Sequence, residues 1–170
     1  EEVGEVAVDT ETTSLDPHQA DLVGISLCSK VGKACYIPVG HKSPKCLKKD
    51  AVIKKLKKIL EDPSIKKIGQ NIKFDFIVFY KCGITLSSME DTMLMSYVLD
   101  AGKNRHNMDT LSEIHLGHKT ISFKEMVGTG KKEINFSEVE LDKAKDYAAE
   151  DADVTFRLYK KFIKNLKSEK

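Results

Sequence analysis

Apolar and polar residues alternate along the first forty residues of the chain. Three runs combine this alternation with β-branched and aromatic residues: EVAVDTE (5–11), DLVGISLC (21–28) and ACYIPVG (34–40). The segments LDPHQA and SKVGK that separate these runs are rich in turn-forming residues. Because short connections join antiparallel neighbours, the pattern predicts an antiparallel meander.

Helical periodicity replaces the alternation after this meander. Residues 48–61 repeat apolar positions with a helical period, and Asp62-Pro63 ends the predicted helix. A short strand over 66–70 follows, and then a helix over 72–81 that Asn71 can cap and Gly83 closes. The stripe of the first helix that we expect to face the core consists of Val52, Leu56, Ile59 and Leu60.

The second half of the chain is predicted to be mainly helical. Two helices are expected over 91–100 and 108–117, and a long one runs from about Leu141 onward. The glycine-containing segment 127–134 lacks the Lys-Ser/Thr of a phosphate-binding loop, so we interpret it as an ordinary loop. Together the elements predict an α/β fold in which one mixed β-sheet is flanked by α-helices. On the last helix, one stripe carries Tyr147, Asp151, Val154, Leu158 and Phe162.

Composition places the chain among soluble globular proteins. Its 170 residues suit one domain, and 41% hydrophobic and 32% charged residues are typical of a globular protein. The net charge of +2 does not by itself indicate nucleic-acid binding. No apolar run approaches the roughly 18 residues of a membrane span, so we expect an intracellular protein. The four cysteines lack metal-ligand spacing, and we expect them to be reduced and mostly packed.

The first predicted strand ends with two carboxylates on the same face. Asp9 and Glu11 are two residues apart, and side chains of a strand alternate with a period of two. Like charges held this close repel each other unless a cation lies between them or one carboxylate keeps its proton. The pair is therefore either a solvated strand end or half of a cation site.

Two more acids occur where apolar residues are expected. Asp75 lies inside the apolar segment IKFDFIVF, and Asp151 lies on the core-facing stripe of the last helix. Each acid alone is compatible with a structural role, but several carboxylates from different elements are the ligands that Mg²⁺ and Mn²⁺ prefer. We therefore expect a two-ion site for phosphoryl displacement. Tyr147, one helical turn before Asp151, can orient or deprotonate the attacking water.

Three segments resemble the motifs of the DEDD exonuclease superfamily, tyrosine subtype. They are VDTET with Asp9 and Glu11, GQNIKFD with Asp75, and YAAED with Tyr147 and Asp151, in the chain order of that family. The segments IPVGHK, DTML, RHNMDTL, HKTISFKE and YAAEDADVT are similar to the proofreading 3′-5′ exonuclease domains of bacterial DNA polymerase I, family A. This resemblance extends over nearly the whole chain.

The resemblance implies a ribonuclease-H-like fold, two divalent ions (Mg²⁺ or Mn²⁺) and release of nucleoside 5′-monophosphates from the 3′ end of DNA. It implies that Asp9 bridges both ions, that Glu11 and Asp151 hold the ion that activates water, and that Asp75 serves the other. Tyr147 would position the nucleophile. The implied nucleic-acid contacts are Leu15 and Phe123 with the terminal bases, and Thr12, Gln70, Asn71, Lys73 and Arg105 with the sugar-phosphate backbone.

The implied partners are a single-stranded or frayed 3′ end of DNA and a polymerase domain of the same parent chain. We expect residues 1–170 to be one exonuclease domain excised from a longer DNA polymerase, monomeric and located with the nucleoid in the bacterial cytoplasm. Two alternatives stay open: an RNA 3′-5′ exonuclease of the ribonuclease D type, and a catalytically silent DNA-binding or structural module. For Leu15 and Phe123, core packing is an equal alternative to base contact.

Overall fold

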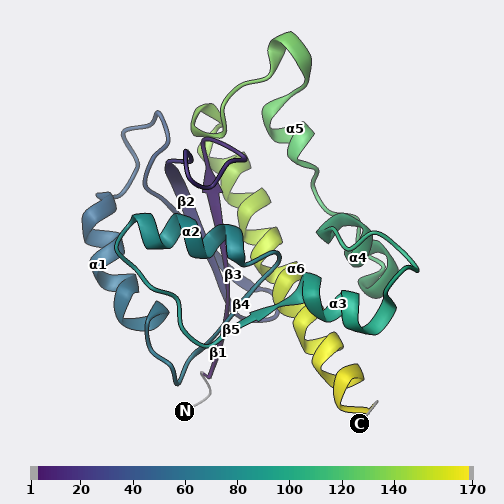
Figure 1. Cartoon of the computed structure of the whole chain (residues 1–170). Helices are drawn as coiled ribbons and strands as arrows, with labels where there is room; N and C mark the ends of the chain where they lie inside the picture. Colours follow the sequence, from purple (N-terminus) through teal and green to yellow (C-terminus); the bar gives the residue numbers. More distant parts are fainter. Residues whose placement is uncertain (1–3, 169–170) are drawn as a thin grey trace.

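The computed structural model describes residues 4–168, in which one mixed sheet lies between two layers of helices (Figure 1). The strand order is β3-β2-β1-β4-β5. The first three strands pair antiparallel, which confirms the predicted meander. On the other side of β1, β4 pairs parallel with β1, and β5 pairs parallel with β4. A strand of three residues carries too little alternation to be recognised, so the sequence did not predict β5. The strands are β1 (Glu5–Thr12), β2 (Leu22–Lys30), β3 (Lys33–Pro38), β4 (Lys66–Gly69) and β5 (Met89–Asp91).

The helices divide between the two faces of the sheet because successive residues of β1 point in opposite directions. Val8 packs among α1 and α2, whereas Ala7 packs against α3, α4 and α6. The predicted helices are confirmed, and three short ones between residues 123 and 138 were not predicted. The helices are α1 (Lys49–Leu60), α2 (Lys73–Lys81), α3 (Thr92–Asp100), α4 (Met108–Leu116), α5 (Phe123–Val127), η1 (Gly130–Lys132), η2 (Phe136–Glu138) and α6 (Leu141–Ser168).

Helix α6 crosses the sheet at close range because its inner face carries small residues. Ala144, Ala148 and Ala152, spaced one turn apart, are fully buried. This alanine stripe brings the helix backbone near β1 and β2, so that Asp151, which directly precedes Ala152, is buried as well. Even α6, whose 28 residues make it the longest helix of the described chain, contains no apolar stretch that could cross a membrane.

Several local expectations were wrong. Ile59 is 42% exposed because Val52, Leu56 and Leu60 already form the i, i+4, i+8 stripe that faces the sheet. Asn71 does not cap α2 through its side chain; it has a φ of 59° and turns the chain between β4 and the helix. Gly83 does close α2, because the N–H groups of residues 83 and 84 bond to the carbonyls of residues 80 and 79.

The four cysteines are free thiols, but most of them are not buried. Only Cys28 lies in the core; Cys35 is exposed, and Cys46 and Cys82 are partly exposed. The expectation of mostly packed cysteines therefore holds for Cys28 and for Cys82, which packs against the core, and not for the exposed Cys35. Small thiols on an edge strand and near helix ends do not require burial to be tolerated.

Candidate active site

The carboxyl end of β1 carries the first two acids of the site. Asp9 and Glu11 share the face of Ala7, which is the face that α6 covers. Glu11 is only 6% exposed, and Asp9 is partly exposed. The alternation predicted from the sequence therefore points both carboxylates toward α6 and not into solvent.

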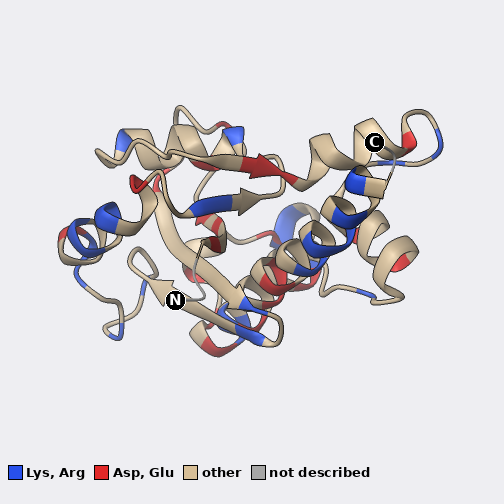
Figure 2. Ribbon diagram, turned by 90° about the horizontal axis from the view of Figure 1, so that it is seen from below, with Lys and Arg blue, Asp and Glu red and all other residues tan. Residues whose placement is uncertain are grey.

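Asp151 completes a group of three carboxylates. One oxygen each from Asp9, Glu11 and Asp151 lies within 4.8 Å of the others. Asp151 is 6% exposed, and between residues 4 and 168 no ion pair involves any of the three. Figure 2 shows acidic positions in the N-terminal half of α6 and basic positions toward its other end, away from the group. The negative charge of the three acids thus has no cationic counterpart in the described part of the chain.

Asp75 lies beside this group but is turned toward the backbone of β1. Its Oδ1 accepts hydrogen bonds from the backbone N–H of Thr10 at 2.9 Å and from the Thr10 hydroxyl at 2.6 Å. Because β4 ends at Gly69, the N–H of Thr10 has no strand partner there, and Asp75 in the first turn of α2 supplies one. The structure therefore places Asp75 next to the three-carboxylate group without making it a member.

Burial and mutual repulsion raise the pKa of all four acids. Burial raises the pKa of Asp9 to about 7. The pKa values of Glu11, Asp75 and Asp151 lie well above their usual range, first because of burial and then because of the neighbouring negative charges, above all Asp9. A buried set of oxygen donors that holds protons this strongly fits a hard divalent cation, which would replace the protons and remove the repulsion.

Tyr147 lies one helical turn before Asp151 and faces the same group. Burial raises the pKa of the Tyr147 hydroxyl far above its usual range, and the charge of Asp151 raises it further. The hydroxyl therefore stays protonated at neutral pH and can donate a hydrogen bond. Orientation and deprotonation of the attacking water both stay predictions for Tyr147.

A cleft of about 360 Å³ opens over the acids. Leu15 at its mouth is 88% exposed and Phe123 is 41% exposed, so neither side chain packs in the core. The Phe123 ring stacks on Phe136 at 6.1 Å between centroids, with an interplanar angle of 7°. Thr12 also lines the cleft. Lining residues from distant segments that were not among the predicted contacts include Phe74, Met108, Glu133, Ile134, Asn135 and Phe136.

The other four residues expected to contact nucleic acid do not line this cleft. The Gln70 amide donates to the His106 carbonyl at 2.8 Å and accepts from the Thr92 hydroxyl, so it is occupied within the protein. The N–H of Asn71 donates to Asp91 at 3.0 Å. Lys73 and Arg105 are exposed, on α2 and on the α3–α4 connection, and Lys73 lines another groove. Their contacts with nucleic acid stay predictions.

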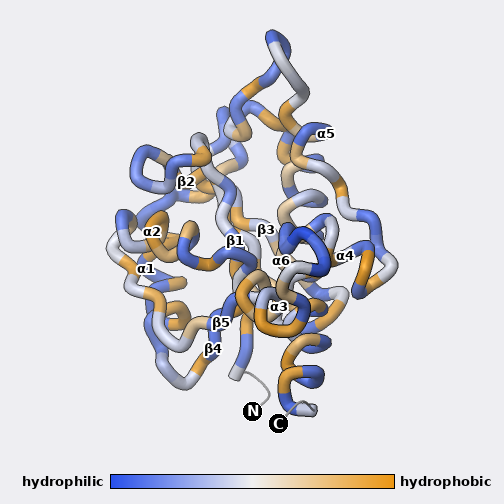
Figure 3. Tube along the Cα trace, turned by 45° about the vertical axis from the view of Figure 1, so that its right-hand side comes forward, coloured by the Kyte–Doolittle hydropathy of each residue, from blue (hydrophilic) through white to orange (hydrophobic). Residues whose placement is uncertain are grey.

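A larger groove, of about 780 Å³, lies elsewhere, between α2, β5, α3 and the end of α6. Its wall is mainly apolar, and Figure 3 shows hydrophobic positions concentrated on α3 beside it. Among the described residues, Asp9, Glu11 and Asp151 form the one group of acids able to share an ion, and it lies in the smaller cleft. Chemistry and not size therefore identifies the candidate site.

Comparison with known proteins agrees with this geometry. A family model described as 3′-5′ exonuclease matches residues 1–167. The chain is 44% identical to DNA polymerase I of Pseudomonas aeruginosa over 99% of its length, and 45% identical to that of Rhizobium leguminosarum over 92%. It spans only 19% and 17% of those two relatives.

Solved structures of other nucleases share the fold. Brucella melitensis NrnC with bound Mg²⁺ superposes with a TM-score of 0.76 at 24% identity, covering 98% of this chain and 75% of that one. Escherichia coli RNase D, an exoribonuclease, superposes with a TM-score of 0.70 at 19% identity, covering 98% of this chain and 40% of that one. These similarities confirm the ribonuclease-H-like architecture predicted from the sequence.

Proposed function

Because the chain belongs to the 3′-5′ exonuclease family of DNA polymerase I, we propose that it hydrolyses DNA from the 3′ end and releases nucleoside 5′-monophosphates. The observation that carries this proposal is the group of the buried Glu11 and Asp151 with the partly exposed Asp9, which has no cationic partner in the described chain. A purely structural domain would gain stability by losing these charges, since unpaired buried charge is destabilising. Their presence is explained by a ligand that the acids bind.

Asp9, Glu11 and Asp151 would hold divalent ions, with Asp75 beside them on α2. A pair of Mg²⁺ or Mn²⁺ ions supplies Lewis-acid stabilisation of the attacking and leaving oxygens in such a displacement. Asp75 holds the end of β1 through its two hydrogen bonds from Thr10, and so fixes the direction of the side chains of Asp9 and Glu11 on either side of Thr10. Tyr147, one turn before Asp151 on α6, would orient the attacking water through its hydroxyl.

Leu15 and Phe123 would receive the terminal bases of the strand. Stacking on an aromatic ring is worth about 1–3 kcal/mol per base and does not depend on base identity. This suits an enzyme that removes any mismatched nucleotide. Contacts with the sugar-phosphate backbone are proposed for Thr12 in the cleft, and for Gln70, Asn71, Lys73 and Arg105 outside it.

We further propose that residues 1–170 act as one domain of a longer DNA polymerase, which would deliver a frayed 3′ end to the cleft in the bacterial cytoplasm, at the nucleoid. The relatives with 44% and 45% identity are DNA polymerases, which favours DNA as the substrate. The similarity to RNase D supports an RNA substrate less strongly, because at 19% identity it concerns the fold alone. We propose that the domain acts as a monomer.

The test incubates the protein with a 5′-labelled DNA strand that carries a 3′ mismatch, in Mg²⁺, in Mn²⁺ and in EDTA. We expect a ladder that shortens by one nucleotide at a time from the 3′ end and requires a metal ion. An RNA strand of equal sequence tests the alternative substrate, because the two differ in the 2′-hydroxyl. Asp9→Ala should abolish cleavage and leave single-strand binding largely intact. Equal cleavage by the wild type and Asp9→Ala would refute the assignment.

A further inference from the structure

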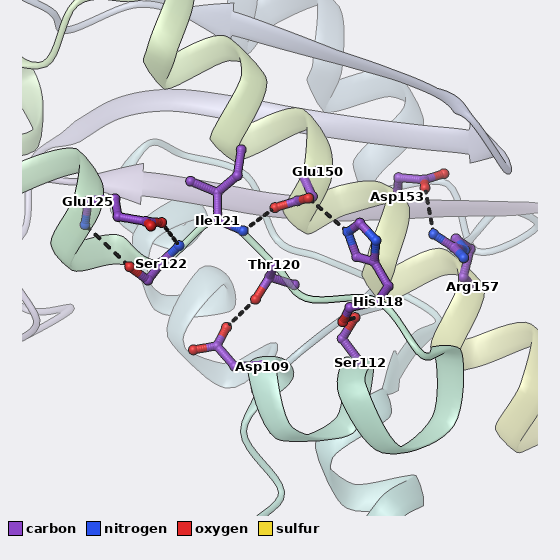
Figure 4. A network of polar contacts seen from close by, with 10 residues as sticks. All are labelled: Asp109, Ser112, His118, Thr120, Ile121, Ser122, Glu125, Glu150, Asp153 and Arg157. Carbon is purple, nitrogen blue, oxygen red and sulfur yellow. Dashed lines mark hydrogen bonds and ion pairs between the residues drawn. The ribbon is translucent and has the colours of Figure 1, made fainter.

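Glu150 on α6 directly precedes Asp151, yet both oxygens of its carboxylate are engaged by another segment. Its Oε1 accepts a hydrogen bond from Nε2 of His118 at 2.8 Å, and its Oε2 accepts one from the backbone N–H of Ile121 at 2.6 Å. Figure 4 shows the carboxylate between these two donors. The side chain is 18% exposed, so water competes little for its oxygens. Each oxygen of Glu150 thus has a donor within the protein, and Glu150 is not a member of the acid group.

The segment that Glu150 holds, residues 117–122, connects α4 to α5. Its other side-chain bonds lead back to α4: Ser112 donates to the His118 carbonyl at 2.8 Å, and Thr120 donates to Asp109 at 2.7 Å. Within the described chain, the hydrogen bonds from this segment to α6 are the two made by Glu150. Without them this connection would keep its bonds to α4, and α5 would be held to α6, within the described chain, by the apolar packing of the cluster that contains Val127 and Ala144.

The position of Phe123 follows from this attachment. Ser122 and Glu125 form a capping box that starts α5, so the chain passes from the anchored Ile121 to Phe123 without a flexible residue between them. The Phe123 ring then lies 6.3 Å from the ring of Tyr147, centroid to centroid. Glu150 thus connects the wall of the cleft to the same helix that carries Tyr147 and Asp151.

We propose that Glu150 is a positioning residue that sets where Phe123 lies relative to the acids, and hence where the 3′-terminal base lies relative to the bond to be cleaved. The functional part of this proposal rests on the exonuclease activity proposed above. A displacement of about 1 Å in groups that position a substrate can cost about 10²-fold in rate, which explains why an aromatic contact would need such an anchor. Glu150 touches neither substrate nor ion in this role.

The first test measures position without any cleavage. The sequence contains no tryptophan, so Phe123→Trp creates a single fluorescent reporter in the cleft wall. In that background, Glu150→Ala should increase acrylamide quenching and lower the fluorescence anisotropy. The matched control is Asp146→Ala, which removes an exposed acid that directly precedes Tyr147 on the same helix. Unchanged fluorescence in a folded Glu150→Ala protein would overturn the proposal.

The second test separates positioning from effects on the ions. Glu150→Ala should raise KM for a single-stranded oligonucleotide about tenfold, the equivalent of one lost stacking contact. It should shift the Mg²⁺ concentration for half-maximal rate much less than it shifts KM, although it removes a charge that raises the pKa of Asp151. It should add little to the effect of Phe123→Ala. A full, independent effect in the Phe123→Ala background would overturn the proposal.

Glu150→Gln serves where the alanine variant does not fold, because the amide keeps one acceptor for the N–H of Ile121. It should give intermediate quenching and an intermediate KM. Quenching equal to that of the parent Phe123→Trp protein, together with a wild-type KM, would overturn the proposal. If the wild type itself cleaves nothing, the proposed function fails, while the fluorescence comparison still decides whether Glu150 positions residue 123.

Discussion

The two ends of the central sheet bury charge in opposite ways. Near the beginning of β4, Lys67 is fully buried, and its Nζ donates to the carbonyl of Asp62 at 2.6 Å and to the Ser87 hydroxyl at 3.2 Å. It also donates to the carbonyl of Ile65. At the other end of the sheet, Glu11 and Asp151 are also almost completely buried, but what surrounds them is further negative charge.

The difference separates a structural charge from a functional one. Burial lowers the pKa of Lys67, but oxygen acceptors from three residues surround its Nζ and compensate for lost water. The carboxylates have less compensation within the described chain: a backbone hydrogen bond from Thr10 to Asp9 and one from Tyr147 to Asp151 only partly oppose the rise of their pKa values. A folded protein can keep such an arrangement when a ligand from outside completes it. Buried charge therefore indicates a binding site when its partners are missing, and not by its presence alone.

The largest effect is expected from removing one of the uncompensated charges. Glu11→Gln should lower the exonuclease rate by about 10²–10³-fold, the usual cost of losing one preorganised electrostatic group. The same change should raise the free energy of unfolding in EDTA, because it relieves repulsion with Asp9 and Asp151. Oligonucleotide cleavage and urea unfolding measure the two effects. Glu140→Gln, which alters an exposed acid, should change neither.

A variant with lower activity and also lower metal-free stability would contradict this contrast, since it would mean that the Glu11 charge supports the fold.

The compensated charge should behave in the opposite way. Lys67→Met keeps the length of the side chain but removes the Nζ donor of the Ile65 carbonyl and one of the two donors of the Asp62 carbonyl. We expect a loss of about 1–3 kcal/mol in the free energy of unfolding, the cost of unsatisfied buried polar groups. The rate per folded molecule should stay close to wild type. Urea unfolding at saturating Mg²⁺ gives the stability, and an exposed-lysine variant, Lys55→Met, is the control.

The smallest effect concerns the pH dependence of stability. Because burial raises the pKa of Asp9 to about 7, the folded protein holds this proton more tightly than the unfolded chain does. The associated stability is present at low pH and is lost as pH rises through about 7. The melting temperature in EDTA should therefore fall over this range, whereas the increase produced by Mg²⁺ should grow, because the ion and the protons compete for the same oxygens.

Thermal melts with and without Mg²⁺, from about pH 5.5 to about pH 8.5, check this sign. The slope in EDTA should be smaller in Asp9→Asn. If the stabilisation by Mg²⁺ does not vary with pH, the ion does not bind to these carboxylates.

The sequence was most informative where one element decides the outcome alone. Alternation in β1 was enough to place Asp9 and Glu11 on one face, and the stripe of α6 was enough to turn Asp151 inward. Both follow from the period of a single element, so no knowledge of its neighbours was required. The same holds for the meander and for the long helices.

What the sequence did not predict depends on distant segments. Asp75 was recognised as an acid in an apolar helix, but its bonds to Thr10 depend on where β4 ends. Phe136 and Glu150 carry no local pattern that distinguishes them from other aromatic or helical residues. Their roles arise from Phe123 and Ile121, which approach them only in the folded chain.

The alanine stripe of α6 makes the site an assembly of two rigid halves. One half is β1 with Asp9 and Glu11; the other is α6 with Tyr147, Asp151 and, through Glu150, the cleft wall. The two halves meet where the methyl groups of Ala144, Ala148 and Ala152 pack against the sheet. A bulkier residue at one of these positions would push α6 away from β1 and would displace together the groups that α6 carries. Each half would keep its internal geometry while their alignment was lost. Such a protein would retain its fold and the contacts within each half, but Asp151 would no longer lie close enough to Asp9 and Glu11 to share an ion with them.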